Sequence, residues 1–294
     1  MDALAPLTGE QSIDCGVAPY SATLTIPWVQ GSRADGQEVY IPADIVFYGQ
    51  ADHENRTYYG HSSGIAAHFN RDKAVELALT ELIERDAIMR NWYLMEKPER
   101  IKDDILPIHA QKRIEYWKQL GRDVVFLEMK SEFGEVIMTA VFSDSPPCFV
   151  CGAAATLKVN DIEKTIIKAL QEAEYNLILS LDEEWNIKPE EVKTPTDHGR
   201  LYHQREYAET LRWLTNGEEV SHFSLKQNKD YREVLKQVNG IIVNIGEIEE
   251  LKAVRVLSPE LVPINFGYHT AHYTHKSVMG EQERNKTRLP HYFS

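Results

Sequence analysis

The sequence predicts an α+β fold with a mixed β-sheet and helices packed against it. Residues 71–93 carry apolar side chains at helical spacing, and residues 161–181 repeat that pattern. Between these helices lie two short apolar segments rich in β-branched residues, 124–129 and 136–142, which are typical of strands. No internal repeat or low-complexity linker divides the chain, so a single domain over residues 1–294 is the simplest account.

An apolar stripe supports each of the two long helices. In the first helix the stripe consists of Val75, Ala78, Leu79 and Leu82. Pro98 marks the far limit of this helix, because proline cannot continue a helical hydrogen-bond ladder. In the second long helix, Asp161 is a candidate N-cap. Shorter helices are expected over residues 109–120, 206–214 and 231–238.

The strand predictions begin with residues 38–48, an apolar segment interrupted by Pro42 that forms one kinked strand or two short ones. The two central strands can pair as a hairpin through a turn at Gly134. The remaining strand candidates are residues 241–245 and 253–256, whereas an irregular segment and a surface loop are expected over residues 1–37 and 181–200.

Composition restricts the classes of partner. The 294 residues include 43% hydrophobic and 26% charged residues, and the net charge is −13. An acidic surface repels phosphate backbones, which argues against nucleic acid and anionic membranes as partners. No apolar segment approaches the ~20 residues that span a bilayer. The three cysteines and the lack of a signal peptide predict a cytoplasmic protein.

Helical spacing brings three charged residues of the first long helix onto one face: Glu81, Glu84 and Arg85. Two carboxylates three residues apart can hold a hard cation such as Mg²⁺, and the adjacent guanidinium can pair with a phosphate oxygen. The same spacing also occurs in ordinary salt bridges on helix surfaces. From the spacing alone, both interpretations stay open.

Residues 61–87, HSSGIAAHFNRDKAVELALTELIERDA, resemble the characteristic segment of the YcaO family. That segment has a Ser-Asn-Gly turn followed by a helix ending in Glu-Leu-x-Glu-Arg-Asp-Ala. Residues 81–87 match it fully, and residues 62–64 match it except that Ser63 replaces the asparagine. Weaker similarities involve residues 27–43, residues 151–172 and the C-terminal LPHYFS.

This resemblance implies a YcaO-like fold and an enzyme that uses ATP and Mg²⁺ to activate backbone amides. The chain has no GxxxxGK[ST] loop, and family members bind ATP through a cluster of glutamates instead. By analogy Glu81 and Glu84 hold Mg²⁺, and Arg85 contacts phosphate or orients a glutamate. The implied reaction is cyclodehydration of Cys, Ser or Thr to azolines in a bacteriocin-like peptide. The implied partners are the precursor peptide, a leader-binding protein and a flavin dehydrogenase.

The chain departs from the family pattern in two respects. Phe69 and Lys73 occupy positions where the family helix carries the asparagine and glutamate that serve the nucleotide site. Nothing before residue 61 resembles the family's earlier Glu-x-x-Glu-Arg helix, so the chain is expected to correspond to the C-terminal part of the family domain. Two alternatives follow: a non-catalytic scaffold of the same complex, or an enzyme that forms thioamides.

Other candidate residues have structural interpretations. Glu172 lies on the second long helix at a position where the family has a glutamate, and Asp86 lies on the apolar side of its helix. The lone pair Cys148 and Cys151 lacks the further ligands of a structural zinc site, so buried thiols are expected. The histidines that repeat every third residue near the C-terminus remain a candidate metal site: His269, His272 and His275.

Overall fold

The computed structural model describes residues 25–47, 61–181, 186–268 and 289–294, with the separate residues 12, 17–19, 21, 23 and 58. These residues form two compact units. The first unit comprises the described residues up to Asp86 and residues 230–265, and the second comprises residues 87–229, 266–268 and 289–294. Whether the two units constitute one domain over residues 1–294 remains a prediction.

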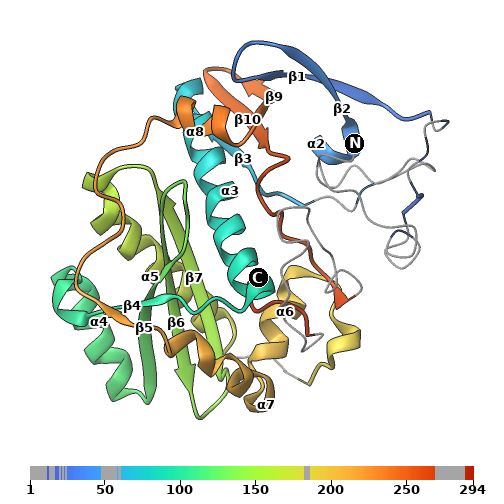
Figure 1. Cartoon of the computed structure of the whole chain (residues 1–294). Coiled ribbons are helices and arrows are strands. Elements are labelled where there is room, and N and C mark those ends of the chain that lie inside the picture. Colours follow the sequence, from blue (N-terminus) through green and yellow to red (C-terminus); the bar gives the residue numbers. More distant parts are fainter. Residues whose placement is uncertain are drawn as a thin grey trace. The chain divides into compact units, whose positions relative to one another are not determined.

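The first unit contains a five-stranded antiparallel sheet in the order β2-β1-β9-β10-β3 (Figure 1). Its strands are β1 (Trp28–Arg33), β2 (Glu38–Pro42), β3 (Ile65–His68), β9 (Ile241–Ile248) and β10 (Leu251–Leu257). The sheet packs on a core that includes Ile41, Val46 and Val243. The strands predicted over residues 241–245 and 253–256 are therefore confirmed within β9 and β10.

Two predictions near the N-terminus are wrong. Residues 28–33 are not irregular but form β1, because the turn at Gly36 folds this polar segment back along β2. The strand predicted over residues 38–48 ends at Pro42, and the following residues form the single-turn helix α2 (Ala43–Val46). Proline fixes φ and has no N–H for a strand ladder, so the chain changes conformation there.

The long helix α3 (Arg71–Leu94) confirms the prediction over residues 71–93. Its first turn is capped by the side chain of Asn70, whose Oδ1 accepts a hydrogen bond from the N–H of Lys73 at 3.1 Å. It ends before Met95, which has a left-handed φ of 53°. The predicted apolar stripe is buried: Val75, Ala78, Leu79 and Leu82.

The second unit contains a mixed sheet in the order β7-β6-β5-β4-β8, in which only β4 and β8 run parallel. The bounds are β4 (Glu99–Ile101), β5 (Arg122–Met129), β6 (Glu135–Ser143), β7 (Phe149–Thr156) and β8 (Glu219–Val220). The predicted hairpin is confirmed, because β5 and β6 pair in antiparallel register. The central strands are buried on both faces, which explains their nearly continuous apolar sequence.

Helices α4 (Ile108–Gln119) and α5 (Ile162–Leu179) cover one face of this sheet (Figure 1). Glu174 joins the two helices, since it accepts a hydrogen bond from Trp117 Nε1 at 2.7 Å and lies 2.9 Å from Arg113. The helix expected over residues 161–181 is thus confirmed. Asp161 is its N-cap residue, as predicted, but the Asp161 side chain makes no capping hydrogen bond and the residue also ends a short 3₁₀ turn.

The opposite face of the sheet is covered by aromatic side chains of the second unit. Trp92, Phe149, Tyr202 and Tyr292 make edge-to-face contacts with centroid distances of 5.7–6.4 Å. Tyr202 belongs to α6 (Pro195–Tyr202), so the surface loop predicted over residues 181–200 is partly wrong. Pro195 occupies the first turn of α6 after a capping box formed by Thr194 and Asp197, and proline is favourable at that position.

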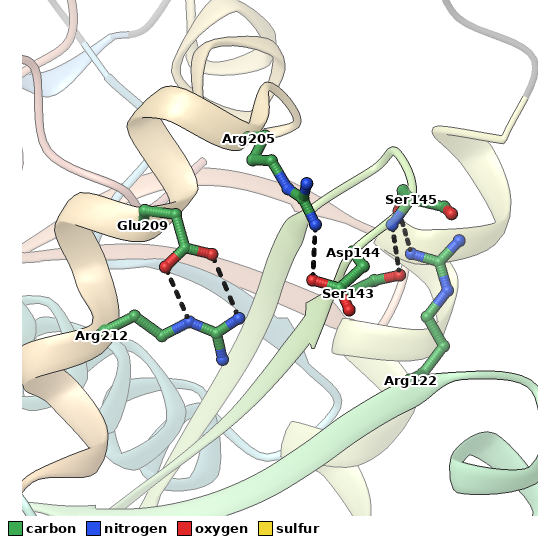
Figure 2. A network of polar contacts seen from close by, with 7 residues as sticks. All are labelled: Arg122, Ser143, Asp144, Ser145, Arg205, Glu209 and Arg212. Carbon is green, nitrogen blue, oxygen red and sulfur yellow. Dashed lines mark hydrogen bonds and ion pairs between the residues drawn. The ribbon is translucent and has the colours of Figure 1, made fainter.

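The predicted short helices are also present. Residues 206–214 divide into α7 (Arg205–Ala208) and a 3₁₀ helix (Glu209–Thr215), and residues 231–238 correspond to α8 (Tyr231–Gln237). Figure 2 shows the polar contacts at the turn between β6 and β7, where Arg205 pairs with Asp144 at 2.7 Å and Arg122 donates to the carbonyl of Ser145. These contacts hold a turn that is otherwise without regular structure.

Candidate functional site

The three charged residues singled out on the first long helix lie together in the first unit. Arg85 stands between the two carboxylates of α3. Its Nη2 lies 3.9 Å from Glu81 Oε1, and its Nη1 lies 3.5 Å from Glu84 Oε1. The side chains are 29%, 11% and 16% exposed for Glu81, Glu84 and Arg85 respectively. These charges are therefore mostly removed from water, unlike a solvated salt bridge on a helix surface.

The loop before β3 fixes one of these carboxylates. The N–H of Gly64 donates a hydrogen bond to Glu81 Oε2 at 3.1 Å, while the carbonyl of Gly64 accepts from the N–H of Val256 at 2.8 Å. Gly64 has φ +77°, and a Cβ atom there would lie 2.3 Å from the Val256 carbonyl oxygen. Only glycine fits this backbone position, which explains the glycine in the Ser-x-Gly turn of the sequence.

Buried polar residues hold the loop before β3 in place. Arg255 of β10 is fully buried and donates to the carbonyls of Val46 and His61, each at 2.8 Å. His61 Nδ1 accepts a hydrogen bond from the N–H of Ser63, and its Nε2 lies 3.2 Å from the hydroxyl of Tyr58. Burial, together with the charges of Arg255 and Arg85, lowers the pKa of His61 to about 3, so its ring stays neutral at physiological pH.

A small cavity of about 40 Å³ adjoins this loop in the first unit. His61 and Ser63 supply polar atoms to its wall, and Leu82 of α3 and Val262 supply apolar ones. Its size is suited to water rather than to an organic ligand. The cavity therefore belongs to the supporting structure of the loop and not to a substrate site.

The donor set fits Mg²⁺ only when further ligands come from elsewhere. Two carboxylates offer hard oxygen atoms, and Mg²⁺ in proteins is commonly held by one or two carboxylates together with phosphate oxygens and water. Within the part of the chain that the structure describes, no group of three or more His, Cys, Asp or Glu side chains could hold a metal ion alone. Glu81 and Glu84 thus fit a cation that arrives with a phosphate ligand.

The sequence profile of a family described as YcaO cyclodehydratase, ATP- and Mg²⁺-binding, matches residues 3–262 of the chain. The protein belongs to the YcaO family. ATP and Mg²⁺ are therefore the cofactors of the family to which it belongs. No curated protein sequence matches the chain significantly.

Solved YcaO structures share the fold. The heterocyclase TruD has a TM-score of 0.69 at 15% identity, with 98% of this chain and 45% of that chain covered. The YcaO protein of Methanopyrus kandleri, bound with AMPPCP and Mg²⁺, has a TM-score of 0.61 at 19% identity and coverages of 84% and 71%. The E. coli microcin synthetase McbBCD with pro-MccB17 bound has a TM-score of 0.65 at 14% identity and coverages of 88% and 68%.

The predicted α+β class and YcaO-like fold are thus confirmed. A further heterocyclase, in complex with substrate and cofactor, has a TM-score of 0.70 at 16% identity, and 88% of this chain is covered. The chain spans only 38% of that heterocyclase and 45% of TruD. Among the described helices, none is both long and apolar enough to cross a membrane.

The two departures from the YcaO pattern lie at the start of α3. Phe69 is 71% exposed, and its ring cannot ligate a metal. Lys73 pairs with Glu76 at 3.2 Å, so its charge is partly compensated within the helix. Neither residue replaces the asparagine and glutamate that the family pattern has there. The charged candidates for a nucleotide site on α3 are therefore Glu81, Glu84 and Arg85, further along the helix.

The remaining candidates have structural roles, as expected. Asp86 is 2% exposed and accepts a hydrogen bond from the N–H of Val262 at 2.7 Å. Glu172 accepts from the N–H of Ala153 at 2.8 Å and thereby satisfies the outer edge of β7. Cys148 and Cys151 are buried, as predicted. The three histidines of the C-terminal region, His269, His272 and His275, lie outside the described residues.

Sequence reasoning missed the residues that support the site. Arg255 lies inside an apolar strand, AVRVL, and a lone arginine in such a segment indicates a buried, hydrogen-bonded guanidinium. His61 stands at the start of the segment that resembles the family, but no spacing rule links it to α3. Its hydrogen bonds with Arg255 and Ser63 become visible only in the folded chain.

Proposed function

We propose that this YcaO protein binds Mg²⁺ and ATP at Glu81, Glu84 and Arg85 and activates backbone amides of a peptide. The observation that carries the proposal is the convergence of two poorly exposed carboxylates and a guanidinium on one face of α3. Family membership supports the same assignment.

Each side chain has a separate task in this proposal. Glu84 offers a carboxylate that is only 11% exposed, so its charge acts on a bound cation with little screening by water. Glu81 is oriented by the Gly64 N–H, which leaves Oε1 as the oxygen directed toward Arg85. Arg85 provides a fixed positive charge for a phosphate oxygen and compensates the two carboxylates when phosphate is absent.

The proposed reaction is cyclodehydration of a peptide. A Cys, Ser or Thr side chain attacks the preceding amide carbonyl and loses its proton, and departure of the amide oxygen leaves an azoline ring. ATP supplies the phosphoryl group that makes this oxygen a good leaving group. The protein positions the reactants and neutralises charge on the phosphates.

The proposed partners are the precursor peptide and a leader-binding protein, and a flavin dehydrogenase if azolines are oxidised to azoles. The microcin synthetase complex with its bound pro-MccB17 supports partners of this kind. We expect the protein to act in the cytoplasm, where a thiol such as that of Cys148 stays reduced.

A scaffold without catalysis is the second candidate function. The exposed Phe69 ring and the Lys73–Glu76 pair favour it, because neither supplies a metal ligand where the family pattern has one. Mass spectrometry of the precursor peptide, incubated with ATP, Mg²⁺, the chain and its co-encoded proteins, separates the candidates. Loss of water that disappears with Glu84→Gln supports the enzyme. Loss of water that persists with Glu84→Gln supports the scaffold. In a parallel reaction to which sulfide is added, replacement of the amide oxygen by sulfur would indicate thioamide formation.

A further inference from the structure

Two carboxylates are buried at one end of the sheet in the second unit. Glu128 of β5 is 5% exposed and Glu135 of β6 is 1% exposed. Both belong to strands that form the predicted hairpin, and both lie where this hairpin turns. Carboxylates are almost never buried to this extent unless their charges are compensated.

Each carboxylate anchors the same segment of irregular chain. Glu128 Oε1 accepts a hydrogen bond from the N–H of Ser224 at 2.9 Å, and Glu135 Oε2 accepts from the N–H of Leu225 at 2.8 Å. These consecutive amides belong to residues 221–229, the covering segment, which has no helix or strand to satisfy its backbone. Leu225 inserts into the core beneath α4 and α5, so the covering segment closes that end of the core.

The other oxygen of each carboxylate has no donor among the described residues. Glu128 Oε2 and Glu135 Oε1 are both buried and lack a hydrogen-bond partner there. The two carboxyl groups lie on paired strands and accept from consecutive amides, an arrangement in which one can donate a hydrogen bond to the other. Two carboxylate anions cannot do so, because neither carries a donor. A single proton placed on one of them satisfies both oxygens at once.

We infer that Glu128 and Glu135 share one proton at neutral pH and that this proton holds the covering segment closed over the core. Loss of the proton would leave two adjacent buried anions, which repel each other and cannot remain dry. The covering segment is the element that can yield near Ser224 and Leu225, because it has no ladder of its own and its other anchors, at Asn228 and Lys229, lie at its C-terminal end. The protonated pair therefore holds the covering segment in place, and deprotonation of the pair releases it.

Burial and the surrounding charges together favour the protonated form of the pair. Burial, and then the Glu128 carboxylate, raises the pKa of Glu135 to about 8, against a weaker opposite effect of the Leu225 amide and the Lys226 charge. Other cations nearby are engaged elsewhere: Lys229 donates to the carbonyl of Glu132, and Lys130 pairs with Glu96 at 3.3 Å. His222 and Glu132 are exposed.

Hydrogen exchange and carboxyl NMR on the full chain test the inference. We expect the Glu135 carboxyl group to titrate near pH 8 by ¹³C shift. Above that midpoint, the protection of the Ser224 and Leu225 amides, corrected for intrinsic exchange, should fall by about tenfold per pH unit, the limit for one proton. Titration of the Glu135 carboxyl group near its ordinary value, about 4, or protection that does not change with pH, would overturn the inference.

Two amide variants provide the decisive comparison. In Glu135→Gln the amide oxygen can still accept from Leu225, and the amide NH₂ can donate permanently to Glu128. We expect both backbone amides to stay protected up to about pH 9 in this variant. Glu128→Gln should behave in the same way, and this variant is used for the comparison if Glu135→Gln does not fold. The control, Glu132→Gln, removes an exposed charge from the same turn and should titrate like the wild type. Wild-type behaviour of the folded Glu135→Gln variant would contradict the shared proton.

Discussion

The Gly64 N–H and the Glu81 carboxylate are joined by a hydrogen bond of 3.1 Å across 17 positions of sequence. This bond ties the turn before β3 to the middle of α3 and restrains the Glu81 carboxylate, whose other oxygen lies 3.9 Å from Arg85. The same turn is held from the other side by the guanidinium of Arg255. Position and charge at the candidate site therefore depend on residues that make no contact with a nucleotide in our proposal.

Replacement of Gly64 by alanine should disrupt this arrangement. The new Cβ would lie 2.3 Å from the Val256 carbonyl oxygen, and the left-handed φ adds roughly 1–2 kcal/mol of strain. We expect a marked loss of thermal stability in Gly64→Ala, and weaker binding of Mg²⁺–ATP by the fraction of this variant that folds. Gly36→Ala is the matched control, since Gly36 also has a positive φ but open space around it. Equal melting temperatures of the two variants would contradict the steric argument.

Removal of the Arg255 guanidinium should destabilise the first unit. Arg255→Met leaves the buried carbonyls of Val46 and His61 without donors, and each loss costs about 1–3 kcal/mol. Denaturant unfolding measures the change in free energy. Arg255→Lys should recover part of the loss, because an ammonium group can reach one carbonyl but lacks the planar fork that serves both. If both variants unfold at the wild-type midpoint, the support assigned to Arg255 is wrong.

Asp86 should affect stability without affecting nucleotide binding. In Asp86→Ala the buried N–H of Val262 loses its acceptor, at a cost of about 1–3 kcal/mol in the free energy of unfolding. Asp86→Asn keeps an oxygen at that position and should lose less. Calorimetric titration at a temperature where the variants are folded should give the wild-type affinity for Mg²⁺–ATP. A selective loss of affinity in Asp86→Asn would instead place Asp86 in the site.

Acidification should destabilise the protein through its buried histidines. Burial lowers the pKa of His198 to about 4, and its ring is held by the Gly267 N–H and the His291 carbonyl. The unfolded chain takes up this proton near pH 6.5, so the contribution is present above pH 6.5 and lost as the pH falls through about 4. The slope per histidine is about 1.4 kcal/mol per pH unit. Denaturant unfolding of His198→Gln between these limits should show a slope smaller by about that amount.

The spacing of apolar residues in the sequence correctly predicted the elements whose buried positions follow a regular period. Helices α3 and α5 and the β5–β6 hairpin show apolar spacing that matches their buried faces. Strand β7 was missed because its sequence, FVCGAAAT, is dominated by small residues rather than β-branched ones. Gly152 in this strand lets α5 approach so closely that a Cβ there would lie 2.3 Å from the Ala173 nitrogen. The spacing of apolar residues within β7 does not reveal this close approach of the helix.

The candidate site was predictable only along one helix. Helical geometry places Glu81, Glu84 and Arg85 on one face, and the structure brings them within 4 Å of one another as pairs with Arg85. Of their supports, His61 lies in the loop before β3, whereas Arg255 comes from β10, far away in the sequence. Long-range contacts of this kind depend on the register of β10 with β3, which a periodic pattern does not specify. The assignment of ligands to Mg²⁺ and ATP itself stays a prediction.

Calorimetric titration of the purified chain with ATP in the presence and absence of Mg²⁺, alone and with co-encoded proteins, tests the central claim most directly. The account predicts saturable binding that requires Mg²⁺ and that weakens by at least about tenfold in Glu84→Gln. Circular dichroism should show that this variant is folded, and Glu115→Gln, at an exposed position of α4, should bind like the wild type. Unchanged affinity in folded Glu84→Gln, or no binding by the wild type in either setting, would contradict the glutamate site on α3.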